Sequence, residues 1–466
     1  MKTFNRVTEK DLAYFRELLP GRVFAGEEIS SDYDHDEMTE YGHYMPEAVL
    51  QALSAEDVCA VLKYCNEHQI AVTPRGAGTG LCGGCVAIHG GVVLSTEKMK
   101  KVLEVDTRNM TATVEPGVLL MEFPKSLEGT GLFYPPDPGE KTATMGGNAM
   151  TNAGGMRAVR YGVTRDYVLG MQVALADGSL IELGGKTVKT SSGYSLINLM
   201  IGSEGTLGFL TRLTVKLVPE PKVNLSLLVP FDDLDACIGA VLKVLASGCD
   251  PTAVEFMERE VISCAETYLG KQFPDVSADA YLLVRLDGPS AEALQPAIDT
   301  LTDLMLSIGA KDVLLADTDE RKESIWNARG AFLEAIKGST STMDECDVVV
   351  PRDVIPAFVH RMVEIGKAAD VRIRSFGHAG DGNLHIYVCR DDLPEDVWKE
   401  KVATVMRQLY DEARALSGEV SGEHGIGHAK KAFLRDSVGE KQIALMRGIK
   451  AVFDPNGILN PGKVVK

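Results

Sequence analysis

The chain has 466 residues, a formal net charge of −18 and 45% hydrophobic residues. This length exceeds one ordinary core, so we expect two or three domains. The acidic balance argues against a nucleic-acid partner, because phosphate recognition needs clustered Lys and Arg. No apolar run reaches the roughly 20 residues that cross a bilayer, and residues 1–10 have no apolar signal core. We therefore expect a globular, cytoplasmic protein without a transmembrane segment.

The N-terminal region predicts two helices and a strand. The first helix is expected over 11–19. The second follows Ser54, whose hydroxyl can cap its first turn, and its apolar residues recur at helical spacing (Val58, Val61, Leu62 and Cys65). The apolar run 70–73 is typical of a strand, and it leads directly into a glycine-rich stretch.

Nine cysteines are scattered along the chain, which makes a disulfide framework improbable. Cys82-Gly-Gly-Cys85 is the only CxxC motif. It could be a redox pair or half a zinc site. We favour two small residues in a glycine loop, since no second CxxC exists to complete a zinc site.

Three glycine-rich patches lie at 74–80, 135–155 and 202–208. The first, Pro-Arg-Gly-Ala-Gly-Thr-Gly, follows the predicted strand and can surround a diphosphate with backbone amides. Its G-x-G-x-G spacing differs from the usual dinucleotide fingerprint, so on its own a tight turn explains it better. So many glycines in the second patch cost conformational entropy, and a large ligand approaching the backbone is one reason to accept that cost.

The sequence pattern changes after Pro219-Glu-Pro221, which is typical of a linker. Short strands, such as 225–229 and 281–286, then alternate with longer helical patterns, which indicates an α+β domain with an antiparallel sheet. From about residue 422 the chain returns to glycine-rich loops, and it ends in Asn460-Pro-Gly-Lys463 and three further residues.

Four of the nine histidines lie in two short motifs, 377–385 and 421–428. We expect His378 in a glycine loop and His385 at the start of a strand, so a turn could bring both imidazoles together. A lone histidine is usually structural, but two glycine-flanked motifs with His, Asp and Glu suit Zn²⁺, Fe²⁺ or Mn²⁺. Three ligands with an open position would mark a catalytic site.

Taken together, these motifs resemble the D-lactate/glycolate/2-hydroxyglutarate dehydrogenase branch of the vanillyl-alcohol oxidase superfamily. The resemblance implies an α+β fold: a two-subdomain PCMH-type FAD-binding domain (1–219), an α+β substrate or cap domain with an antiparallel sheet and the metal ligands (220–421), and a C-terminal segment (422–466) that returns to the FAD domain. Without a histidine in the first loop, we expect non-covalent FAD. The resemblance assigns FAD contacts to Pro74, Arg75, Gly76, Ala77, Gly78, Thr79, Gly80, Pro136, Asp137, Thr142, Gly146, Gly147, Asn148, Asn152, Ala153, Gly155, Glu204, Gly205 and Asn460.

The resemblance also implies roles around a divalent metal (Zn, Fe or Mn). His378, His385 and Glu423 would be ligands and His424 the general base, and adjacent residues of an extended segment would point in opposite directions. Asp381 and Asn383 would orient the imidazoles, and His428 would be structural. The helix motif Trp326-Asn-Ala-Arg329 would supply Arg329 for the substrate carboxylate; the alternative is a solvated helix arginine.

The implied activity is oxidation of a small D-2-hydroxy acid to the 2-oxo acid, with hydride transfer to flavin N5 and electrons passed to a separate acceptor. Apolar Leu333 and anionic Glu345 favour a monocarboxylate such as D-lactate over 2-hydroxyglutarate. Three alternatives stay open: a subunit of an electron-transfer-flavoprotein-linked, possibly bifurcating complex, a glycolate or 2-hydroxyglutarate dehydrogenase, and a non-redox synthase or flavin-binding protein.

Overall fold

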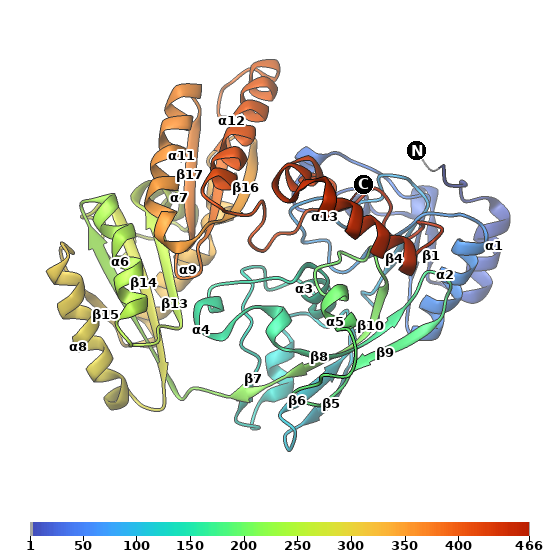
Figure 1. The fold of residues 1–466 in the computed structure, drawn as a ribbon, viewed down its shortest axis with the longest axis horizontal. Helices are drawn as coiled ribbons and strands as arrows, with labels where there is room; N and C mark the ends of the chain where they lie inside the picture. The colour runs from blue at the N-terminus through green and yellow to red at the C-terminus, as the bar shows by residue number, and fades with distance from the viewer. Residues whose placement is uncertain (1–2, 466) are drawn as a thin grey trace. The chain divides into compact units, whose positions relative to one another are not determined.

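The computed structural model describes residues 3–465 (Figure 1), and its contacts divide the chain into two compact units. The first unit comprises the residues up to Gly154, Val163–Glu220 and the chain from Glu423 onward. The second comprises Gly155–Gly162 and Pro221–Gly422. In the range 3–465, no helix combines the length and apolarity needed to cross a membrane. Met1 and Lys2 of the N-terminal stretch lie outside the described residues.

Within residues 3–465, the first unit contains two main sheets and the five α-helices named below. The four-stranded sheet has the order β1-β2-β4-β3, with β2, β3 and β4 parallel, and the five-stranded antiparallel sheet has the order β5-β6-β10-β8-β9. The strands are β1 Val23–Ala25, β2 Ala48–Gln51, β3 Val72–Arg75, β4 Val92–Ser95, β5 Val102–Asp106, β6 Thr111–Val114, β8 Val168–Ala174, β9 Leu180–Gly184 and β10 Phe209–Lys216, with a small pair β7 Leu132–Phe133 and β11 Val218–Pro219. The helices are α1 Glu9–Leu18, α2 Ala55–Glu67, α3 Met145–Thr151, α5 Leu196–Met200 and α13 Lys431–Phe453.

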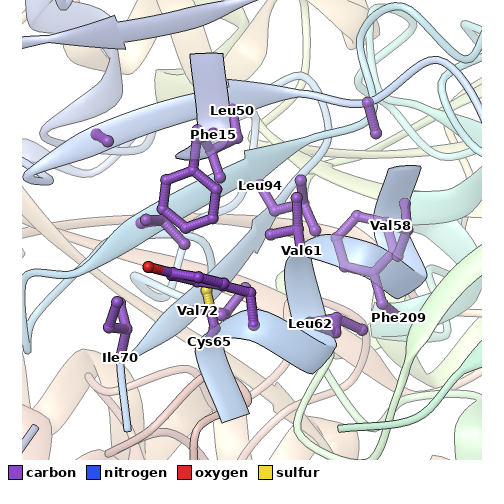
Figure 2. Close-up of a cluster of buried hydrophobic side chains, with 14 of the residues drawn as sticks. Phe15, Leu50, Val58, Val61, Leu62, Cys65, Ile70, Val72, Leu94 and Phe209 are labelled. Carbon is purple, nitrogen blue, oxygen red and sulfur yellow. The ribbon is translucent and has the colours of Figure 1, made fainter. Parts of the chain in front are cut away.

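The predicted helix after Ser54 is confirmed, and it covers the four-stranded sheet. The Ser54 hydroxyl accepts a hydrogen bond from the Asp57 amide, which caps α2. Figure 2 shows the buried face of α2 packed with Phe15, Leu50, Leu94 and Phe209. The strand predicted at 70–73 runs instead from Val72 to Arg75, because these four residues pair with β4. The strand therefore runs into the first glycine patch.

The C-terminal tail belongs to the first unit. The Val72 amide donates to Ile458 O (2.8 Å), and the Asn460 amide donates to Val72 O (2.7 Å). The tail thus lies parallel to β3 as a short bridge. This pairing holds the tail against the strand that leads into the first glycine patch.

The second unit contains the predicted antiparallel sheet. Its seven strands have the order β15-β12-β14-β13-β17-β18-β16, and every pairing is antiparallel. The strands are β12 Val223–Phe231, β13 Ala253–Glu258, β14 Ala280–Gly288, β15 Leu314–Ala316, β16 Met343–Val349, β17 Arg372–His378 and β18 Asn383–Cys389. The helices are α4 Ala158–Tyr161, α6 Leu234–Ala246, α7 Arg259–Leu269, α8 Ala291–Ser307, α9 Asp319–Gly330, α10 Phe332–Lys337, α11 Ile355–Ala369 and α12 Glu395–Ala415.

Helices cover both faces of this sheet, which explains its continuous apolar strands. Tyr281 and Leu283 of β14 pack with α7, α9 and α10, while Leu282 and Val284 are equally buried. Since successive strand residues point to opposite faces, a second layer of side chains must cover the other side, where α6 and α8 pack.

The segment Gly155–Gly162 differs from expectation, because it packs with the second unit. Its helix α4 lies against β13, and Arg160 Nη1 donates to Asp287 O (2.9 Å). Gly155, predicted to line the cofactor, therefore belongs to a different unit from the remaining predicted flavin residues.

Candidate functional site

The three glycine patches, apart from Gly155, come together in the first unit although they are far apart in the sequence. A Cβ on Gly76 would lie 2.5 Å from the Thr144 hydroxyl, and one on Gly205 would lie 2.7 Å from Pro74 Cγ. Gly205 also has φ +69°, which disfavours any larger residue. Backbone and short side chains therefore meet with no room for a Cβ, so the close packing of the patches requires glycine at these positions.

Arg75 holds the first patch in place. Its guanidinium donates to Asp32 O (2.6 Å), His35 O (2.9 Å) and Cys85 Sγ (3.3 Å). None of the nine cysteines, including Cys82 and Cys85, forms a disulfide. Arg75 thus ties the loop to residues 32–35, a structural role that the sequence did not reveal.

The second patch forms helix α3 and the loop before it. The Thr144 hydroxyl accepts from the Gly147 amide, and the side-chain amide of Asn148 is buried without a hydrogen-bond partner within 3–465. A buried, unpaired amide is costly unless a ligand satisfies it. Of the other predicted residues, Pro136 is buried, Asp137 pairs with Lys141, Thr142 is exposed, and Asn152 adopts a left-handed conformation.

The third patch joins the C-terminal tail. Glu204 accepts hydrogen bonds from the amides of Ile426 (2.7 Å) and Gly427 (2.8 Å), and burial raises the pKa of its carboxyl despite these bonds. The Asn460 side chain donates to Gly84 O (2.8 Å) and Glu204 O (2.7 Å). Asn460 thus links Glu204 of the third patch to Gly84, which follows the first patch in the chain.

The predicted base and carboxylate ligand lie beside these patches. A Cβ on Gly154 would lie 2.7 Å from the Glu423 carboxylate. The expectation that Glu423 and His424 point in opposite directions is wrong: His424 Nε2 lies 3.7 Å from Glu423 Oε1. Residues 422–424 form bends, and Gly425 and Gly427 after them have positive φ, so the alternation of an extended strand does not apply.

The second unit carries His378 and His385 on neighbouring strands. His378 is the last residue of β17, not a loop residue as predicted, because its pairing with Asn383 of β18 extends the ladder. β18 begins at Asn383, two residues before the predicted start. Both imidazoles are buried, their ring centroids are 5.2 Å apart, and they offer ligand atoms within 4.8 Å of each other.

Glu255 of β13, which the sequence analysis missed, links His378 to Arg329. Both of its carboxylate oxygens lie 2.9 Å from His378 Nδ1. Its Oε2 also pairs with Arg329 Nη2 (2.6 Å) and Nε (2.9 Å). Burial raises the pKa of Glu255, but the charges of His378 and Arg329 more than offset this and leave the pKa lowered. A single acid within the apolar run Ala253–Met257 was the available signal.

Arg329 is not a solvated helix residue. It is 5% exposed on α9, and its guanidinium carbon lies 4.5 Å from the Phe376 ring centroid. Leu333 packs against the same apolar cluster. The arginine is therefore desolvated and held by Glu255 on one side and an aromatic ring on the other.

Asp347 of β16 is a second residue that the sequence analysis missed. Its buried carboxylate accepts from Asn383 Nδ2 (2.7 Å), Ser421 Oγ (2.8 Å) and the Gly422 amide (3.0 Å), and Oδ1 lies 3.7 Å from His385 Nδ1. Glu423 and His424 follow Gly422 directly in the chain. Asp347 therefore anchors the start of the second histidine motif to the strands that carry the first.

His378 turns Nδ1 toward the Glu255 carboxylate at hydrogen-bond distance, which favours a proton on Nδ1 and leaves the Nε2 lone pair for a cation, as in carboxylate–histidine–metal triads. His385 Nδ1 lies 3.7 Å from Asp347 Oδ1, a distance too long for a hydrogen bond. The donor chemistry of His378 and His385 fits a transition-metal ion. The ligand role of Glu423 stays a prediction.

Known proteins resemble the chain over its length. Residues 46–184 match the family model "FAD binding domain", and residues 220–464 match "FAD linked oxidases, C-terminal domain". The chain is 50% identical over 466 residues to a D-lactate dehydrogenase of Anaerostipes hadrus, covering 99% of this chain and 98% of the relative. It is 39% identical over 433 residues to the glycolate oxidase subunit GlcD of Bacillus subtilis, covering 93% and 91%. The fold is similar to p-cresol methylhydroxylase, with a TM-score of 0.82, 20% identity, and coverage of 99% and 98%.

Proposed function

Because the chain belongs to the family of FAD-linked oxidases, we propose that it is a FAD- and metal-dependent dehydrogenase of a small D-2-hydroxy acid, with D-lactate favoured. The predicted PCMH-type FAD-binding fold with an antiparallel α+β domain is confirmed. The observation that carries the proposal is the pair of buried imidazoles on neighbouring strands, with the Glu255 carboxylate bonded to His378, since a flavin storage protein has no need of a paired histidine site.

The glycine patches would hold FAD. Gly76 and Gly205 allow the patches to pack closely, and the buried Asn148 amide, without a protein partner among residues 3–465, fits a polar ligand bound there. FAD would supply a two-electron acceptor, and a divalent ion held by His378, His385 and Glu423 would supply a Lewis acid. The first loop contains no histidine, so we expect denatured protein to release the flavin into the supernatant.

Arg329 and His424 would act on the substrate. A desolvated arginine recognises a carboxylate strongly, although Arg329 must share its charge with Glu255. His424, whose Nε2 lies 3.7 Å from Glu423 Oε1, would take the hydroxyl proton, which is the usual task of histidine near neutral pH.

A monocarboxylate is favoured over a dicarboxylate. Glu345 is buried with Oε1 4.0 Å from His385 Nδ1, and its charge would repel a second substrate carboxylate. The test is anaerobic flavin reduction with D-lactate, glycolate and D-2-hydroxyglutarate, with D-lactate expected to be fastest. Faster reduction by D-2-hydroxyglutarate would contradict this choice and would favour the 2-hydroxyglutarate alternative.

Electrons would pass to a separate acceptor, for which an electron-transfer flavoprotein is our leading candidate. No Cys-rich cluster motif exists in the sequence to carry them onward. Reoxidation of the lactate-reduced enzyme by such a flavoprotein is the expected result. Failure with this protein but rapid reoxidation by a quinone analogue would identify a different acceptor class.

A further inference from the structure

A second group of potential metal ligands lies in the first unit, outside the flavin and histidine sites described above. Asp34, His35 and His43 each offer a ligand atom within 4.8 Å of the others. Asp34 caps the C-terminal end of the 3-10 helix Ser31–Tyr33, His35 follows it directly, and His43 lies nine residues after Asp34. No part of the proposed chemistry uses these residues.

The distances are close to those of a coordinated cation. His43 Nδ1 lies 2.8 Å and His35 Nε2 3.9 Å from Asp34 Oδ1. Tetrahedral zinc with bonds of about 2.0–2.1 Å keeps its ligand atoms about 3.4 Å apart. Each of these separations therefore needs to change by well under an ångström to admit an ion.

The backbone presets the tautomer of His35. Its Nδ1 lies 2.6 Å from Asp36 O. A carbonyl oxygen can only accept, so Nδ1 carries a proton, and in the neutral imidazole Nε2 then has the lone pair that a metal needs. The fixed second hydrogen bond also orients the ring, as in known metal-ligating histidines.

The loop that carries the ligands is fixed at both ends. The Tyr44 amide donates to Asp34 O (2.7 Å), which brings His43 back beside Asp34. Arg75 binds the carbonyl oxygens of Asp32 and His35, so the loop is tied to the first glycine patch. Little conformational entropy remains to be lost when an ion binds.

We propose that Asp34, His35 and His43 form a divalent transition-metal site of the zinc type, separate from the ion held by His378 and His385. Imidazole and carboxylate ligands suit Zn²⁺, Ni²⁺ or Cu²⁺. Side-chain exposures of 17%, 30% and 57% leave the remaining coordination positions open to water. The ion closes the loop 34–43 and thereby stabilises the segment that Arg75 ties to the flavin domain.

The test counts bound Zn²⁺ on the full-length, FAD-loaded protein after chelator treatment and equilibrium dialysis. His43→Ala and Asp34→Asn should each bind one equivalent fewer than wild type. His360→Ala is the matched control, because His360 also lies beside an aspartate (Asp235, 2.5 Å) at 54% exposure but belongs to no ligand group within the described chain. It should bind as many equivalents as wild type.

Equal Zn²⁺ content in His43→Ala and wild type would overturn the proposal and leave an ordinary His–Asp hydrogen bond. The count does not depend on the proposed function, since it requires no substrate. If His43→Ala loses one equivalent while its flavin is still reduced by D-lactate at the wild-type rate, the two ions are distinct. If D-lactate reduces neither protein, the proposed function fails while the metal count still stands.

Discussion

Glu255 offers the most informative single substitution, because its carboxylate joins the predicted substrate arginine to a predicted metal ligand. Glu255→Gln keeps the shape of the side chain and removes its charge. Breaking a buried ion pair by deleting one partner costs about 3–5 kcal/mol, and the remaining amide oxygen places this change near the lower value. Loss of the carboxylate behind a metal-bound histidine costs about 10–100-fold in metal affinity or activity.

We therefore expect Glu255→Gln to lower the free energy of unfolding by about 3 kcal/mol and kcat/KM for D-lactate by about 10–100-fold. The assays are denaturant unfolding, metal content and anaerobic flavin reduction. Rescue distinguishes positioning from folding: excess metal should restore part of the activity without restoring the stability. Glu260→Gln, an exposed acid in the first turn of α7, is the control and should change neither. Wild-type activity and metal content in Glu255→Gln would refute the reasoning.

Three further substitutions test separate parts of the account. Asp347→Asn weakens the acceptor that fixes Ser421 and Gly422; kcat for D-lactate should fall about tenfold or more at unchanged FAD content, and an unchanged kcat would argue against this role. Gly205→Ala places a Cβ 2.7 Å from Pro74 at φ +69°, which costs about 1–2 kcal/mol of strain. The purified protein should lose its flavin absorbance, and full retention of the flavin would contradict the assignment of FAD to the glycine patches. Burial, with the nearby lysine charges, lowers the pKa of His428 to about 4, so the folded protein loses stability as the pH drops from about 6.5 toward 4, although partial exposure weakens this effect. His428→Asn should therefore lose less thermal stability than wild type between about pH 7 and pH 5. An equal loss in both proteins would contradict this role of His428.

The sequence predicted features that depend on local pattern. The cap at Ser54, the apolar face of α2 and the antiparallel sheet after Pro221 all follow from residue spacing and turn residues. The glycine patches were recognisable because all three occur in the same order along the chain as in the family that the sequence resembles. Their contacts, such as Gly76 with Thr144, could not be read from spacing.

The missed residues depend on strand pairing across long stretches of sequence. Glu255 reaches His378 because β13 pairs with β17, whose contacting residues lie more than a hundred positions further along the chain. Asp347 meets Asn383 because β16 pairs with β18. The orientation of Glu423 and His424 was predicted wrongly, since a bend replaced the assumed extended segment. Site geometry of this kind requires the register of the sheet.

The most direct test of the central claim is anaerobic single-turnover reduction of the flavin by D-lactate, before and after removal of the metal, with FAD content followed throughout. The account predicts rapid bleaching of the flavin band in the metal-loaded protein, loss of bleaching after chelation although FAD stays bound, and recovery when Zn²⁺, Fe²⁺ or Mn²⁺ is restored. Bleaching at the same rate by the metal-free protein would contradict it.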